Sequence, residues 1–190
     1  MSNKIDFIKK WLPMPSDYAL VSEDSERRNK RSVTIVRYQK NGVFSHNGPR
    51  IVEVIENKHL VSIKNLTEVP AGALFSKNQA KELAEEIFEE TNSSYARGLS
   101  YIRMENQQRS FFDAQGKERS FPVQWIKFAH TNGSYNWVTL GGNGKIIEME
   151  IDSHWDYFHG RRKTEMWDND DWVLARSGNG PQLPSPNALA

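Results

Sequence analysis

The sequence contains no cysteine among its 190 residues. This absence excludes disulfide bonds, thiolate metal sites and cysteine nucleophiles. The chain also lacks an apolar run of the roughly 20 residues that a membrane-spanning helix needs, and residues 1–11 lack the uninterrupted apolar stretch of a signal peptide. We therefore expect a soluble, cytoplasmic protein that does not enter a membrane.

An excess of charge of one sign is also missing, because 24 Asp and Glu residues nearly balance 25 Lys and Arg residues and the net charge is +1. Such a balance provides no global field to attract a polyanion, and it disfavours nucleic acid as a partner. Two basic clusters, at 27–31 and 161–163, have the side chains that contact phosphates. Acidic residues flank both clusters, which favours loops that neutralise their own charge.

No stretch matches a catalytic signature. The run Gly141-Gly142-Asn143-Gly144 lies between two predicted strands rather than before a helix, so it indicates a turn and not a phosphate-binding loop. The adjacent pair Ser153 and His154 would point to opposite faces of an extended chain, which is poor geometry for proton transfer. We therefore expect neither enzymatic activity nor a cofactor.

What the sequence does contain is an internal repeat. Three short runs in the first half match three runs in the second half in residue type and order. The matched runs are 33–38 with 123–128, 51–54 with 137–140, and 60–63 with 146–149. Matches that keep the same order indicate two copies of one small α+β unit.

Each copy is predicted to open with a helix. Residues 77–91 place Ala80, Ala84, Ile87 and Phe88 on one helical face, and Ser76 begins a capping box. A shorter helix is predicted near the N-terminus, where Ile5, Ile8, Trp11 and Leu12 share a face. Strands are predicted at 33–39, 51–56, 60–63, 123–129, 134–140 and 145–151. Asn-Gly pairs between several of these segments are typical of hairpin turns.

The intervening segments give weaker signals. We predict a solvated, charge-rich loop at 23–31. Segments 99–104 and 110–113 are predicted to form either a hairpin closed around 105–108 or two edge strands. Residues 69–72 are the candidate linker between the copies. The Gly- and Pro-rich residues 177–190 are predicted to be a tail with little tendency to fold alone.

The second copy has a recognisable order of segments: a capped helix beginning S-K-N-Q-A-K-E-L-A, then W-I-K-F, N-W-V-T-L and N-G-K-I-I-E-M-E-I-D. This order resembles the PepSY and PepSY-like group of small α+β modules, over 75–152 and more loosely over 4–66. The resemblance implies a binding or regulatory role without a set of catalytic residues. It implies an α+β fold of two repeated PepSY-like helix-plus-antiparallel-sheet units, at 1–68 and 74–158, with a C-terminal extension at 159–190.

The segment after the last predicted strand is rich in aromatic and acidic residues. Its rings are candidates for contacting a protein or peptide partner, because tryptophan and tyrosine dominate interface energetics. The candidate binding residues are Trp155, Tyr157, Phe158, Trp167 and Trp172. The alternative interpretation is that these rings fold back and cap the sheet.

Two further hypotheses follow from the residues. Asp152, His154, Asp156 and His159 offer nitrogen and oxygen donors for a divalent ion, which would make the protein a metal-dependent hydrolase. We expect no metal there, because the spacing is not that of a known site and a polar sheet edge explains the pattern. Exposed strand edges also allow a homo-oligomer.

Overall fold

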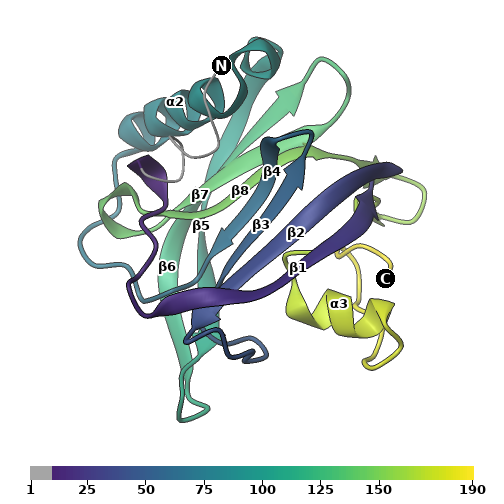
Figure 1. Ribbon diagram of the computed structural model, residues 1–190. Coiled ribbons are helices and arrows are strands. Elements are labelled where there is room, and N and C mark those ends of the chain that lie inside the picture. Colours follow the sequence, from purple (N-terminus) through teal and green to yellow (C-terminus); the bar gives the residue numbers. More distant parts are fainter. Residues whose placement is uncertain (1–9) are drawn as a thin grey trace.

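The protein is built around one antiparallel sheet of eight strands, seen in a computed structural model that describes residues 10–190 (Figure 1). The strands lie in the order β1-β2-β3-β4-β8-β7-β6-β5. Their bounds are β1 Tyr18–Arg28, β2 Arg31–Lys40, β3 Ile51–Glu56, β4 His59–Asn65, β5 Leu99–Phe112, β6 Glu118–His130, β7 Tyr135–Leu140 and β8 Ile146–Ser153. Each half of the chain therefore forms a four-stranded meander, and the two meanders meet at β4 and β8.

The prediction of two separate helix-plus-sheet units is wrong. Strand β4 pairs with β8, placing Ser62 opposite Glu150 and Lys64 opposite Glu148, so the strands of both halves form one continuous sheet. Within the described residues, the only helices longer than one turn are α2 (Lys77–Ala96) and the short α3 (Asp170–Arg176). Joining the meanders satisfies the backbone groups of two strand edges that would otherwise be unpaired.

The six predicted strands coincide with β2, β3, β4, β6, β7 and β8. The repeated runs match β2 to β6, β3 to β7 and β4 to β8, so they mark equivalent positions in the two meanders. Segment 66–76, which contains the predicted linker, connects β4 to α2. The helix predicted around Ile5 and Ile8 lies outside the described residues.

Two segments that were predicted differently are each a single regular strand at an edge of the sheet. The supposed loop at 23–31 is the second half of β1, which turns into β2 at Asn29 and Lys30, both with positive φ. Segment 99–113, predicted as a hairpin or as two edge strands, contains the single 14-residue edge strand β5. Both strands carry charged residues on their exposed surfaces, as edge strands often do, and this concealed their alternation from the sequence.

Helix α2 covers one face of the sheet. Its start at Ser76 is the predicted capping box, in which the Ser76 side chain and the Gln79 side chain satisfy each other's backbone amides. On the buried side, the Phe88 ring meets Phe128 of β6 edge to face, with centroids 5.3 Å apart, and Thr91 lies against Met149 of β8. The predicted apolar stripe is confirmed, and the helix continues past Thr91 through a kink at Asn92.

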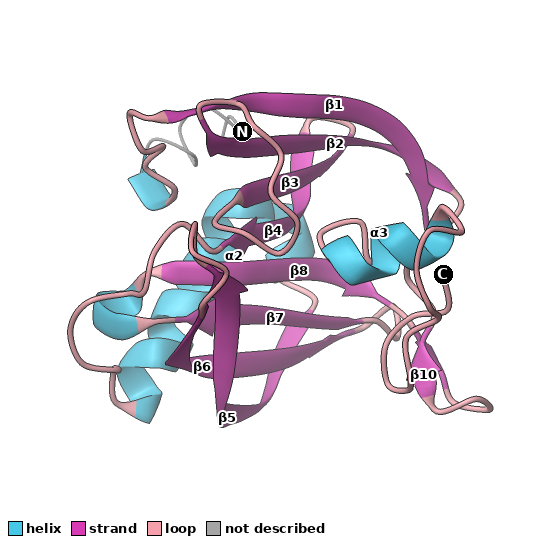
Figure 2. Ribbon diagram, turned by 90° about the horizontal axis from the view of Figure 1, so that it is seen from below, coloured by secondary structure: helices cyan, strands magenta, loops and turns pink. Residues whose placement is uncertain are grey.

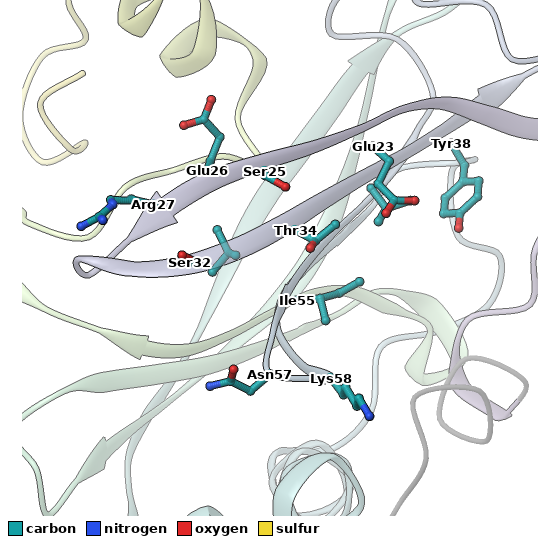
Figure 3. A pocket seen from close by; sticks show the side chains of 12 residues that line it. Glu23, Ser25, Glu26, Arg27, Ser32, Thr34, Tyr38, Ile55, Asn57 and Lys58 are labelled. Atoms are coloured by element: carbon teal, nitrogen blue, oxygen red, sulfur yellow. The ribbon is translucent and has the colours of Figure 1, made fainter.

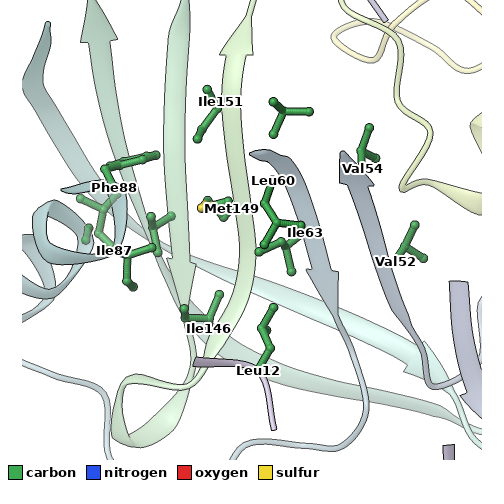
Figure 4. Packing of buried hydrophobic residues seen from close by; sticks show 14 of the residues in the cluster. Leu12, Val52, Val54, Leu60, Ile63, Ile87, Phe88, Ile146, Met149 and Ile151 are labelled. Atoms are coloured by element: carbon green, nitrogen blue, oxygen red, sulfur yellow. The ribbon is translucent and has the colours of Figure 1, made fainter. Parts of the chain in front are cut away.

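Figure 4 shows the core at the junction of the two meanders, where side chains of β3, β4 and β8 gather beside α2. Ile63 and Met149 lie opposite each other on β4 and β8 and are fully buried. Because successive side chains of a strand point to opposite faces, their neighbours Lys64 and Glu148 point away from α2. This second face carries the C-terminal segment and the candidate site.

The C-terminal segment packs on the face opposite α2 (Figure 2). It comprises the small hairpin of β9 (Trp155–Asp156) and β10 (Arg161–Arg162), helix α3, and a tail. The predicted tail is not detached, since Ala188 is buried and the backbone amide of Arg162 donates to the carbonyl of Pro186 at 2.9 Å. The tail folds because the rest of the sheet provides the apolar surface that it lacks alone.

Candidate functional site

An open groove of about 590 Å³ lies on the face opposite α2, over strands β5 to β8. Aromatic and charged side chains line it. The aromatic lining residues are Trp125, Tyr135, Trp137 and Trp155, and the charged ones are Lys64, Arg103, Glu105, Arg109, Lys127, Glu148, Glu150, Arg162 and Asp168. We call this hollow the groove, and its mixture of rings and charges makes it the candidate binding site.

Strand pairing explains how the aromatic floor forms. Lys127 of β6 lies opposite Trp137 of β7, and Trp125 lies opposite Thr139. Residues directly opposite on antiparallel strands share a face, so the rings of Trp125 and Trp137 come within 6.0 Å of each other. Both rings are partly exposed, which leaves apolar surface for a ligand to cover.

Glu148 is a buried carboxylate at the base of the groove. Arg109 holds it with two hydrogen bonds of 3.0 and 2.8 Å, and the Thr139 hydroxyl donates to it at 2.9 Å. Lys64 lies 3.4 Å from Glu148 and also pairs with Asp168 at 3.0 Å. Burial alone would raise the pKa of Glu148, but the charges of Lys64 and Arg109 and these hydrogen bonds lower it to about 2. Glu148 is therefore ionised and fixed at neutral pH.

Glu150 forms a second buried cluster beside it. Its Oε1 accepts hydrogen bonds from Arg28 Nη2 at 2.6 Å and from Arg162 Nη2. Arg28 is only 1% exposed, and the Arg162 guanidinium lies over the ring of Trp137, 5.3 Å from its centroid. One member of each predicted basic cluster is thus bound inside the protein. These ion pairs hold the wall of the groove in one arrangement.

Lys127 differs from the other cations of the groove. Its ammonium lies 3.8 Å from the centroid of the Tyr135 ring and 5.5 Å from that of Trp125. It forms no ion pair with any residue in 10–190. Partial burial lowers the pKa of Lys127, and the nearby charge of Arg103 lowers it further, against a smaller opposing effect of Glu105.

The β9–β10 hairpin forms one rim of the groove and carries three of the five predicted binding residues. Trp155 lines the groove itself. The Tyr157 hydroxyl meets that of Tyr135 at 2.6 Å, and the Phe158 ring, 91% exposed, stands at the hairpin tip. The structure therefore places Trp155 in the groove and Tyr157 in contact with Tyr135 of its lining, whereas Phe158 is on the same hairpin but does not line the groove.

The other two predicted binding residues lie elsewhere. Trp167 and Trp172 are 8% and 0% exposed, and their rings meet edge to face at 4.8 Å within the core. For these two rings, the alternative interpretation that they cap the sheet describes their position. Neither ring offers the surface that a partner would need.

The four candidate metal ligands do not converge on one point. His154 Nε2 lies 3.1 Å from Asp152 Oδ1, whereas His159 Nδ1 lies 2.7 Å from Asp156 Oδ2 in a separate pair on the hairpin. Arg31, Asn29 and Asn132 also contact the Asp152 carboxylate. Within 10–190, no three His, Asp or Glu side chains are grouped to hold a metal ion.

A second, wider hollow of about 930 Å³ lies over β1 to β3 (Figure 3). Small hydroxyl side chains such as Ser25 and Thr34 line it, together with Tyr38 and Lys58. Its lining contains a single aromatic ring, whereas four rings line the groove. This hollow provides a matched control surface for experiments on the groove.

The residues that form the floor of the groove were not predicted from the sequence. The signal was present in alternate residues: Trp125 and Lys127 on one strand, and Tyr135 and Trp137 on the next. What the sequence did not reveal is which face of the sheet α2 covers, and therefore which alternate set stays open.

No model of a known protein family matches this chain, and no curated protein is similar to it in sequence. The resemblance to PepSY-like modules thus remains a prediction. No helix among the described residues is both long enough and apolar enough to cross a lipid bilayer.

Proposed function

We propose that this is a non-catalytic binding protein whose groove receives an extended segment of a protein partner. The observation that carries the proposal is the concave surface on which Trp125, Tyr135, Trp137 and Trp155 converge while remaining partly open. Its volume of about 590 Å³ lies within the range of ligand sites in proteins. Aromatic rings in such a position supply most of the binding energy in protein recognition.

The position of β5 supports an extended segment as the ligand. Strand β5 is an outer strand of the sheet, and its residues Arg103, Glu105, Gln107 and Arg109 line the groove. A partner chain that pairs with the free edge of β5 would add a strand to the sheet. Alternate side chains of that strand would then face the same side as the groove.

The buried ion pairs support binding by a rigid surface. Glu148 and Glu150 fix Arg109 and Arg162 in the groove before any ligand arrives. A preorganised surface loses less conformational entropy on binding than a mobile one does. The exposed Phe158 at the rim adds an apolar contact beyond the groove.

The proposal is tested by selecting peptides from a random phage-displayed library on the immobilised protein. We expect enriched peptides to bind at least about tenfold more weakly to the Trp125→Ala/Trp137→Ala double variant, because loss of two central rings typically costs more than 1 kcal/mol. The matched control is Tyr38→Ala, which removes the aromatic ring of the other hollow. This control should bind the peptides like the unmodified protein.

Thermal unfolding followed by circular dichroism establishes that each variant is folded before its binding is compared. The proposal is contradicted if no peptide is enriched, or if the enriched peptides bind the groove variant as tightly as the control. Light scattering would detect a dimer that forms through β5. Because such a dimer would occupy the β5 edge that the proposal assigns to a partner, a selection on it that enriches no peptide would count against the proposal.

A further inference from the structure

The charges of the groove balance except at one residue. Each of the other four cations is paired with a carboxylate of the groove. The pairs are Arg103 with Glu105, Arg109 with Glu148, Arg162 with Glu150, and Lys64 with Asp168. Lys127 is the one cation of the groove that forms no ion pair with a carboxylate of the described residues. The groove therefore presents one unneutralised positive charge.

The surroundings of Lys127 make this charge costly to leave unpaired. Its ammonium rests on the face of Tyr135 and lies near Trp125, which partly shield it from water. The neighbouring residue across the β5–β6 pair is Arg103, a second cation. The ring face attracts the ammonium, but partial burial and the charge of Arg103 both disfavour its charged form. An incoming anion would therefore relieve an existing electrostatic penalty.

We propose that the groove recognises an acidic peptide segment, in which one Asp or Glu carboxylate binds the Lys127 ammonium while neighbouring apolar side chains cover Trp125 and Trp137. This inference rests on the proposed function, and it names the chemistry of the partner. The Lys127 ammonium lies close to the rings of both Trp125 and Tyr135, so a carboxylate bound there places the adjoining peptide residues near aromatic surface.

The charge balance of the groove favours a ligand with a single carboxylate over a nucleic acid or a phosphorylated peptide. A nucleic acid strand or a phosphorylated peptide would bring more negative charge than the single free cation neutralises. Its further charges would meet Glu105, Glu148, Glu150 and Asp168, which line the same groove. A single carboxylate needs only Lys127, and hydrogen bonds to charged groups are among the stronger ones in proteins.

The test uses three synthetic peptide pools with random apolar and aromatic residues around one fixed central position. That position is Glu in the first pool, Gln in the second and phosphoserine in the third. We expect the Glu pool to bind about tenfold more tightly than the Gln pool, as measured by fluorescence polarisation at low salt. The difference should shrink as salt is added, because salt screens the ion pair.

Three variants assign the preference to Lys127. Lys127→Met removes the charge, keeps an unbranched side chain of similar size and should abolish the Glu-over-Gln difference, while Lys127→Arg should keep most of it. The matched control is Lys58→Met, which removes a cation from the other hollow and should leave the difference unchanged. The arginine variant also keeps the test decisive if the methionine variant folds poorly.

The outcomes separate this inference from the function on which it rests. Equal binding of the Glu and Gln pools, with both lost in the Trp125→Ala/Trp137→Ala variant, would overturn the acidic assignment and leave the groove as the binding site. Tightest binding by the phosphoserine pool would overturn the choice of a carboxylate. Binding of all pools that is insensitive to the groove variant would overturn the proposed function itself.

Discussion

We expect Glu148→Gln to lower the free energy of unfolding at pH 7 by about 3–5 kcal/mol, which is the usual cost of removing one partner from a buried ion pair. The substitution leaves Arg109, and in part Lys64, as partly buried cations without their counterion. Urea denaturation of both proteins at the same pH measures the difference. The control is Glu68→Gln, because Glu68 pairs with Lys145 at an exposed position and should contribute no more than about 1 kcal/mol.

The same variant carries a pH signature. The pKa of Glu148 falls from its ordinary value of 4.5 to about 2 in the folded protein. A carboxylate with a lowered pKa stabilises the fold above its unfolded pKa, and this contribution is lost as pH falls through the folded pKa. The stability difference between the unmodified protein and Glu148→Gln should therefore be constant above about pH 5 and shrink between about pH 4.5 and pH 2. A difference in unfolding free energy below about 1 kcal/mol, or one that does not change with pH in that window, would show that Glu148 does not stabilise the groove.

The second large effect is expected at Trp172. Replacing Trp172 with Ala should reduce the free energy of unfolding by about 3–5 kcal/mol, because the ring is fully buried against Trp167 and its removal leaves a cavity. The comparison variant Phe158→Ala should change stability by less than about 0.5 kcal/mol, since that ring is 91% exposed.

Denaturant unfolding of these two variants tests whether the C-terminal segment belongs to the cooperative core. If Trp172→Ala costs as little as Phe158→Ala, the segment around α3 is not part of the cooperative core. If Phe158→Ala is the more damaging change, the hairpin tip packs against the protein and is not available to a partner. Either result would require a different assignment of the aromatic residues.

The regular elements were largely predictable from local patterns. Helix α2 begins at the predicted Ser76 because the capping box and the apolar stripe are both local signals. The turn at Asn41 adopts a positive φ, as Asn-Gly pairs do, and so ends β2 where the sequence indicated. These features depend on residues within a few positions of each other.

The joining of the two meanders could not be predicted in the same way. The pairing of β4 with β8 consists of backbone hydrogen bonds, and backbone atoms carry no residue-specific signal. The edge strand β1 was hidden for another reason. Its residues at 23–27 are charged or hydroxylic on both faces, so the strand shows no alternation of apolar and polar side chains.

The buried charges were also hidden. In the run I-I-E-M-E-I-D, Glu148 and Glu150 resemble the water-facing half of an amphipathic strand. They are buried because their partners arrive from distant positions, Arg28 from β1 and Arg109 from β5. The candidate groove depends on the same long-range contacts, which is why its floor was missed while its rim was found.

The groove is tested most directly by the indole signals of the six tryptophans in a nitrogen–proton NMR spectrum, assigned with single Trp→Phe variants. On titration with a peptide selected on the protein, the signals of Trp125, Trp137 and Trp155 should shift, because these rings line the groove. Those of Trp167 and Trp172, which are buried in the core, should stay in place. Shifts confined to Trp167 and Trp172, or no shift at all from a bound peptide, would contradict the assignment of the groove as the binding site.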